Sequence, residues 1–203
     1  MDLDITRASA AHRDRVVATI VAAFACDPAF RHFFPDDTTY ERHAATFAGY
    51  LFDKRVQLGT VWLAGDADAV ALWDPPHPPV DDTWSRVELP DDVRERIDRY
   101  DRAVHALLPA QPYWYLGVLA RHPSVAGRGW GRLLLAAGVT TAHADGLPAY
   151  LETASESNVE FYRHAGWEVV GTVPDAGLPT WLLTNRPYRT DPEDVPALAR
   201  AES

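Results

Sequence analysis

The sequence predicts an α/β protein in which helices flank a central sheet that is mixed and mostly antiparallel. Helical hydrophobic spacing alternates along the chain with short apolar runs of strand length. One such run, residues 113–120, is almost entirely apolar or aromatic, which is typical of a central strand buried on both faces. The 203 residues suit a single domain with one hydrophobic core. We therefore expect one domain over residues 1–187 and a loosely ordered tail over residues 188–203, where charge, proline and alanine predominate.

The N-terminal part predicts a short strand followed by helices. Residues 4–7 are expected to form the strand, and apolar residues recur at helical spacing over residues 17–24, in a helix that ends before Pro28. Residues 27–35 are aromatic without a regular period, which indicates a loop or a broken helix. Another helix is expected over residues 40–51, where apolar side chains share one face.

A β-hairpin is expected next, because two apolar runs, residues 61–64 and 69–73, flank the turn formers at residues 65–68. Four prolines and a histidine occupy residues 75–79 and prevent the second strand from continuing. In the rest of the chain we expect strands at residues 113–120, 149–152, 167–172 and 180–183, and helices at residues 93–107, 134–141 and 158–164.

Composition narrows the classes of partner and compartment. The formal net charge of −10 argues against a polyanionic partner such as nucleic acid or an anionic membrane, and it favours a cationic ligand such as a protonated amine. Cys26 is the only cysteine, so the chain forms no intrachain disulfide. The first residues are acidic, and no apolar run reaches the ~20 residues needed to cross a bilayer. We therefore expect a cytoplasmic protein.

Residues 118–134 combine a buried strand, a short connection, three alternating glycines and a helix. Gly127, Gly129 and Gly131 allow the backbone to approach a ligand closely. The first turn of the helix offers free N–H groups and a positive dipole end, which together suit a pyrophosphate. Arg128 and Arg132 add positive charge to an otherwise acidic chain. This stretch is therefore the candidate anion-binding turn.

The turn has four possible interpretations. A P-loop requires Gly-Lys-Ser/Thr at its end, whereas the chain has Gly131-Arg132-Leu133. A Rossmann fingerprint requires G-x-G-x-x-G after the first strand of a βαβ unit, and the spacing here is G-x-G-x-G, late in the chain. A plain tight turn needs one glycine rather than three. The turn resembles the acetyl-CoA loop of the GNAT superfamily, Gln/Arg-x-x-Gly-x-Gly/Ala, except that Ala126 stands at its first position.

The resemblance to the GNAT superfamily extends beyond the turn. The segments Leu151-Glu152-Thr153, Phe161-Tyr162 and Gly166-Trp167, with Asn158 between them, are similar to the second half of a GNAT domain. Within the superfamily the chain most resembles the puromycin N-acetyltransferase branch, over segments that run in order from the first helix to the last strand. These segments include Ala23-Phe24-Ala25, Val61-Trp62, Ala69-Val70-Ala71, Trp114 with Leu116, and Thr180-Trp181.

The resemblance implies that acetyl-CoA binds between two strands that splay apart, residues 113–120 and 149–152. It further implies that the backbone N–H of Leu119 polarises the thioester carbonyl. The cofactor-binding residues implied are Leu119, Ala120, Arg121, Ala126, Gly127, Arg128, Gly129, Trp130, Gly131, Arg132 and Asn158. Asn158 is expected to contact pantetheine, to cap a helix, or to do both.

The same resemblance implies direct acetyl transfer with Tyr162 as the general acid, and the alternative is a tyrosine that only packs. A phenol titrates near ~10 and a thiol near ~8.5, so a phenol can reprotonate a departing thiolate. Glu152 is expected to accept the proton of the amine, to anchor its ammonium form, or to serve a structural role.

Aromatic residues from several segments are expected to border the acceptor cleft. We predict that Phe30, Phe33, Trp73 and Trp114 line it and that Asp27 anchors the ammonium group or caps the neighbouring turn. We expect no metal site, because His122, His143 and His164 lack metal-ligand spacing. We also expect no covalent intermediate, since neither Ser124 nor Cys26 shows an activating context.

These observations predict an acetyl-CoA-dependent N-acetyltransferase that acetylates a primary amine of a small molecule, with an antibiotic such as puromycin or a related aminonucleoside as one candidate. Two alternatives stay open. One is acetylation of a peptide or protein amine, and the other is a non-catalytic module that binds acyl-CoA as a sensor. The resemblance is compatible with a monomer or a homodimer.

Overall fold

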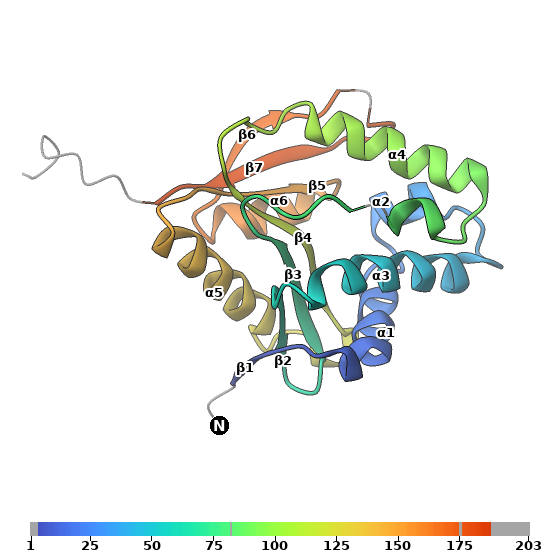
Figure 1. The fold of residues 1–203 in the computed structure, drawn as a ribbon, viewed down its shortest axis with the longest axis horizontal. Coiled ribbons are helices and arrows are strands. Elements are labelled where there is room, and N and C mark those ends of the chain that lie inside the picture. The colour runs from blue at the N-terminus through green and yellow to red at the C-terminus, as the bar shows by residue number, and fades with distance from the viewer. Residues whose placement is uncertain (1–3, 82, 175, 188–203) are drawn as a thin grey trace, which may run out of the picture.

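The computed structural model describes residues 4–81, 83–174 and 176–187, and the expected tail at residues 188–203 lies outside them (Figure 1). The described residues form one seven-stranded sheet with the order β1-β2-β3-β4-β5-β7-β6. The strands are β1 (Ile5–Arg7), β2 (Val61–Ala64), β3 (Ala69–Asp74), β4 (Trp114–Arg121), β5 (Ala149–Thr153), β6 (Glu168–Thr172) and β7 (Trp181–Asn185).

Every neighbouring pair of strands is antiparallel except β4 and β5, which are parallel. The mixed, mostly antiparallel sheet predicted from the sequence is therefore confirmed. The parallel pair is short: its register joins only Trp114 with Ala149 and Tyr115 with Tyr150. Beyond Tyr115, β4 continues for six residues paired with β3 alone. The two central strands thus separate partway along the sheet.

Helices cover both faces of the sheet (Figure 1). One cluster of buried residues joins the sheet to α1–α4, and a second joins it to α5 and α6. The helices are α1 (Arg13–Ala23), α2 (Pro28–Phe33), α3 (Tyr40–Val56), α4 (Asp91–His105), α5 (Trp130–Ala144) and α6 (Glu156–Arg163), with 3-10 turns η1 (Ala10–His12), η2 (Thr83–Arg86) and η3 (Pro123–Val125).

The aromatic segment at residues 27–35 contains the short helix α2, in agreement with the broken-helix interpretation. Asp27 begins this helix, because its Oδ1 accepts the backbone N–H groups of Ala29 and Phe30 at 2.9 and 3.1 Å. Pro28 occupies the first helical position, where its missing N–H costs nothing. The cap and the proline together explain why a helix starts at this point.

Strand β4 differs from the expectation of burial on both faces. Its side chains alternate between buried and half-buried up to Ala120, and Arg121 is exposed. A bulge interrupts its pairing with β3: Leu72 pairs with Val118 and Trp73 with Leu116, which leaves Gly117 as the extra residue. The bulge changes which side of the sheet the following side chains face.

An ion pair buried beneath the bulge ties α3 to the sheet. Arg55 is 3% exposed and donates to the Asp74 carboxylate, which also has Lys54 Nζ at 3.6 Å. A Cβ at Gly117 would lie 2.5 Å from a guanidinium nitrogen of Arg55. Glycine at the bulge therefore makes room for the buried arginine.

Candidate active site

Two adjoining hollows lie where β4 and β5 separate. The first, here called the inner cavity, encloses about 150 Å³ between α2, α3, α4 and the two strands. The second, the outer cleft, has about 550 Å³ and runs between the end of α1, the second half of β4, the glycine turn and α6. Both are lined by Phe24, Asp27, Leu119, Asn158 and Tyr162. A molecule in the outer cleft thus meets one in the inner cavity at these residues.

The glycine turn forms one end of the outer cleft. Gly127 and Gly129 have φ values of 80° and 76°, a left-handed conformation that favours glycine. A Cβ added at Gly127, Gly129 or Gly131 would meet no atom within 4 Å, so the turn faces open space. The first N–H groups of α5 lack partners within the helix and carry its positive dipole end, and Arg132 lines the cleft beside them. This arrangement suits an anionic group such as a pyrophosphate.

The structure brings most of the predicted cofactor residues to the outer cleft. The lining residues are Leu119, Ala120, Arg121, Gly127, Gly129, Trp130, Gly131, Arg132 and Asn158. Ala126 and Arg128 do not line it. The guanidinium of Arg128 stacks on the Trp130 ring at 5.3 Å instead, and Trp130 packs against Gly65 of the β2–β3 turn, where a Cβ would lie 2.8 Å from the ring. The hairpin thereby supports the glycine turn from below.

The open side of β4 forms the long wall of the outer cleft. Leu119, Ala120 and Arg121 pair with β3 on one side, and on the other side β5 has already left the ladder. Backbone groups on that side are available to a ligand that lies along the strand.

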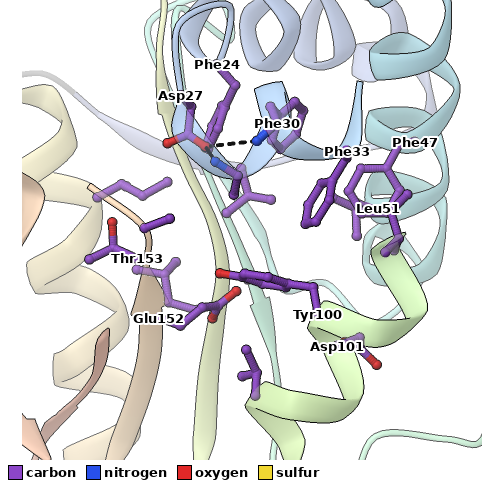
Figure 2. Close-up of a pocket in the computed structure, with 18 of the residues that line it drawn as sticks. Phe24, Asp27, Phe30, Phe33, Phe47, Leu51, Tyr100, Asp101, Glu152 and Thr153 are labelled. Carbon is purple, nitrogen blue, oxygen red and sulfur yellow. Dashed lines mark hydrogen bonds between the residues drawn. The ribbon is translucent and has the colours of Figure 1, made fainter. Parts of the chain in front are cut away.

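Aromatic side chains form one wall of the inner cavity (Figure 2). Phe30 and Phe33 come from α2, Phe47 from α3 and Tyr100 from α4. These rings contact one another, with 5.1 Å between the centroids of Phe33 and Tyr100 and 5.9 Å between those of Phe30 and Phe47. Phe30 and Phe33 therefore line the inner cavity together with rings from α3 and α4.

Glu152 lies on the opposite side of the inner cavity, with Tyr100 across from it (Figure 2). Its Oε2 accepts a hydrogen bond from the Tyr115 hydroxyl. Burial raises the pKa of Glu152 to about 7, and the hydrogen bond from Tyr115 opposes this rise. A carboxyl group with this pKa is partly ionised near neutral pH and can accept or release a proton there.

Helix α4 supplies charged neighbours that the sequence analysis did not assign to the site. His105 Nδ1 lies 3.2 Å from Asp101 Oδ1, and this contact raises the pKa of His105 to about 9. The resulting positive charge lowers the pKa of Glu152, whereas the carboxylate of Asp101 raises it. In the sequence, the apolar periodicity of α4 indicates a core face and nothing more, so no signal pointed to these residues.

Tyr162 on α6 is 8% exposed and lies against Phe161 and Trp167. No hydrogen bond to its hydroxyl is found among the described parts of the chain. Burial is the main cause that raises the pKa of the Tyr162 phenol above its usual range, and the nearby charge of Glu152 adds to the rise. The phenol is therefore protonated at neutral pH and borders both hollows.

Two polar residues line both hollows, and they differ in their hydrogen bonds to neighbouring groups. Asp27 caps α2, and burial raises its pKa, yet it lines both hollows. Asn158 does not cap α6, because the helix begins at Glu156 with Ser155 at its N-cap. Its Nδ2 has only a long 3.5 Å contact with Thr153 Oγ1. The helix-cap interpretation of Asn158 is therefore wrong.

The two tryptophans predicted to line the acceptor site lie elsewhere. Trp73 is fully buried against Gly138 of α5, and Trp114 donates its indole N–H to Asp145 at 2.8 Å, also on the α5 side of the sheet. Trp73 alternates with Ala69 and Ala71 along β3, which places all three on the α5 side, and Trp114 lies on that side before the bulge at Gly117. The structure therefore brings neither tryptophan to the inner cavity or the outer cleft.

Two features are absent from the described residues. No group of three or more His, Cys, Asp or Glu side chains in residues 4–81, 83–174 and 176–187 is arranged to hold a metal ion. Over the same residues, no helix is both long and apolar enough to cross a membrane.

Comparison with known proteins connects this geometry to a family. Residues 88–167 match the sequence model of the Acetyltransferase (GNAT) family, and they span α4, β4, the glycine turn, α5, β5 and α6. The chain has the GNAT acetyltransferase fold. The family match covers the part of the chain that builds the glycine turn and its neighbouring elements, and the fold of the described residues agrees with it. GNAT enzymes use acetyl-CoA as cosubstrate, and the open glycine turn, the α5 N-terminus and Arg132 fit such a molecule.

Solved structures share the GNAT fold over nearly the whole chain. A protein described as histone acetyltransferase HPA2 and related acetyltransferase from Corynebacterium glutamicum is 24% identical, with a TM-score of 0.69 over 92% of this chain and 97% of its own. Arylalkylamine N-acetyltransferase 2 from Aedes aegypti is 12% identical, with a TM-score of 0.66 over 92% and 99%. A polyamine N-acetyltransferase from Drosophila melanogaster is 11% identical, with a TM-score of 0.65 over 91% and 100%.

Proposed function

We propose that this protein transfers an acetyl group from acetyl-CoA directly to a primary amine of a small molecule. The observation that carries the proposal is the meeting of the two hollows at Leu119, Asn158 and Tyr162. The outer cleft has the anion-binding turn that a nucleotide cofactor requires, and the inner cavity has a carboxyl group for an amine. A cofactor and an acceptor bound in this way are in contact at their reacting ends.

The outer cleft binds the cofactor in this proposal. The glycine turn and Arg132 hold the pyrophosphate, and the open edge of β4 pairs with the pantetheine arm. The backbone N–H of Leu119 donates to the thioester carbonyl, whose oxygen gains negative charge during transfer. When bound, acetyl-CoA supplies the activated acetyl group.

Glu152 prepares the amine in this proposal. An ammonium group has no lone pair to attack a carbonyl carbon, so its proton must leave first. The Glu152 carboxylate, whose pKa is about 7, accepts that proton directly or through a water molecule. Asp27 provides a second carboxylate at the junction that favours binding of the ammonium form.

Tyr162 completes the transfer by donating its proton to the departing thiolate. The phenol is protonated at neutral pH, so it carries the proton that the thiolate takes up. The geometric basis is its position on the wall that the inner cavity and the outer cleft share.

The resemblance to the puromycin N-acetyltransferase branch supports an aminonucleoside antibiotic such as puromycin as one acceptor, and cytoplasmic action is part of the same proposal. Acetylation of a peptide or protein amine is less favoured. The inner cavity is small and enclosed by α2, whereas an extended chain needs an open groove.

The test is release of free thiol from acetyl-CoA with a panel of amines that includes puromycin, other aminonucleosides, compact aromatic amines and lysine peptides. Tyr162→Phe should lower kcat by roughly 10²–10⁴-fold, because only the transferable proton is lost. Calorimetric binding of acetyl-CoA to this variant should stay within about twofold of wild type.

The outcomes separate the candidate functions. Turnover with a small amine that is lost in Tyr162→Phe supports the proposal, and equal kcat in the variant refutes the role of Tyr162. Binding of acetyl-CoA without turnover of any amine would favour the non-catalytic sensor. Preferential turnover of lysine peptides would favour a protein acetyltransferase.

A further inference from the structure

We infer that the inner cavity selects an amine with one amino group and, next to it, one apolar group about the size of a six-membered ring. This inference rests on the proposed function. Three features of the cavity carry this inference: its volume, the packing of its aromatic wall, and the uneven distribution of its charged groups.

Volume limits what enters. The inner cavity encloses about 150 Å³. Apolar cavities of about this size in proteins accommodate one benzene molecule. A fused bicyclic group or a nucleoside exceeds this space, so a larger acceptor would place one ring-bearing arm inside and keep the remainder outside.

The aromatic wall is packed too tightly to enlarge freely. Phe33 lies against Phe34, Phe47 and Tyr100, with ring centroids 6.1, 6.1 and 5.1 Å away. All four of these rings are at most 8% exposed. A bulkier guest would displace several packed side chains at once, which is costly in a close-packed core.

Charge is distributed unevenly around the cavity. Figure 2 shows the carboxylates of Asp27 and Glu152 on one side and the side chains of Phe33, Phe47 and Leu51 on the other. The carboxylate of Asp101 also lies on the side of Leu51, where it is paired with His105. An amine is therefore received at the Glu152 side, next to Tyr162 and the outer cleft, and its apolar group points toward α3.

The charged side chains that line the cavity near α3 are already paired, Arg55 with Asp74 and Asp101 of α4 with His105. Arg55 follows Leu51 by one helical turn and lines the cavity, and its partner Asp74 is already neutralised by Arg55 and Lys54. A diamine would place its second charge among aromatic rings or beside the guanidinium of Arg55. Both placements are unfavourable.

The experiment compares kcat/KM for 2-phenylethylamine, 2-(1-naphthyl)ethylamine and putrescine with acetyl-CoA at saturation. Calorimetry measures the binding of each amine to the same protein. We expect both kcat/KM and the binding affinity to be at least about tenfold higher for 2-phenylethylamine than for the other two amines. A difference of this size is what one or two carbon groups that do not fit a pocket produce. Equal or better binding and turnover of the naphthyl amine or of putrescine would overturn the inference.

Phe33→Leu tests the wall directly. The smaller side chain should improve kcat/KM for the naphthyl amine relative to 2-phenylethylamine by about tenfold or more. Val93→Ala, a buried truncation on α4 that does not line the cavity, should leave this ratio unchanged. If both variants changed the ratio equally, general loosening of the core would explain it and the wall would not set specificity.

Failure of the proposed function is distinguishable from failure of this inference. Absence of thiol release with all three amines, together with tighter calorimetric binding of 2-phenylethylamine, would refute amine acetylation and leave the size selection standing. Thiol release that favours the larger or the doubly charged amine would support acetylation and refute the size selection.

Discussion

At the scale of single residues, Glu152 is placed to give the enzyme its pH dependence. A base must be ionised to accept a proton, so kcat/KM should rise with pH through about 7 and level off above it. The groups that face Glu152 act in opposite directions. Burial and Asp101 raise its pKa, whereas the Tyr115 hydrogen bond and the charge of His105 lower it. Tyr115 therefore holds the carboxylate in place and favours its ionised form.

Tyr115→Phe should shift the rising limb of the kcat/KM profile upward by about one pH unit, because the carboxylate loses a hydrogen-bond donor and its pKa increases. Activity lost at pH 7 should largely return at pH 9. Tyr113→Phe is the matched control, since Tyr113 packs against the ring of Tyr115 without bonding to Glu152. If the rising limb of the kcat/KM profile did not move in Tyr115→Phe, Glu152 would not be the titrating base.

At the scale of elements, the glycine turn and α5 are the parts that the sequence predicts best. Three glycines at alternate positions before an apolar helix have few structural explanations, and the structure places them on an open cleft at the N-terminus of α5. The sequence predicts hairpin β2–β3 and the helices equally well, because turn-forming residues and apolar spacing are local signals.

Gly129→Val should weaken acetyl-CoA binding at least tenfold, because the new side chain would enter the cleft and oppose the left-handed backbone. Calorimetry measures the affinity. Gly146→Val introduces similar backbone strain at φ +70° in open space outside the cleft, so it should lower stability without changing affinity. Equal losses of affinity in both variants would assign the effect to instability.

The sequence did not reveal which side of the sheet each strand residue faces. Trp73 and Trp114 have the size and polarity of pocket residues, yet both face α5, Trp73 in alternation with Ala69 and Ala71 and Trp114 with Leu116. The acid–base neighbours from α4 were missed for a related reason. Tyr100 belongs to an apolar helical stripe, and only the tertiary packing brings that stripe across from Glu152.

At the scale of the whole molecule, the buried pair of Arg55 and Asp74 connects the helical layer to the sheet next to the inner cavity. Arg55→Met should destabilise the fold by about 3 kcal/mol, because Asp74 keeps only the distant Lys54 as a partner. Urea unfolding gives the free energy. The double variant Arg55→Met/Asp74→Leu should recover most of the loss, and a single variant as stable as wild type would contradict a structural role for the pair.

The separation of β4 from β5 also divides the chain into two continuous stretches. Strands β1 to β4 precede it and strands β5 to β7 follow it, and each set pairs mainly within itself. Such stretches tend to open and close as cooperative units of their own. A cofactor lying along the separated strands would contact both units, so its binding would slow amide hydrogen exchange in both. A cofactor bound between β4 and β5 would thus help to hold the two halves of the chain together.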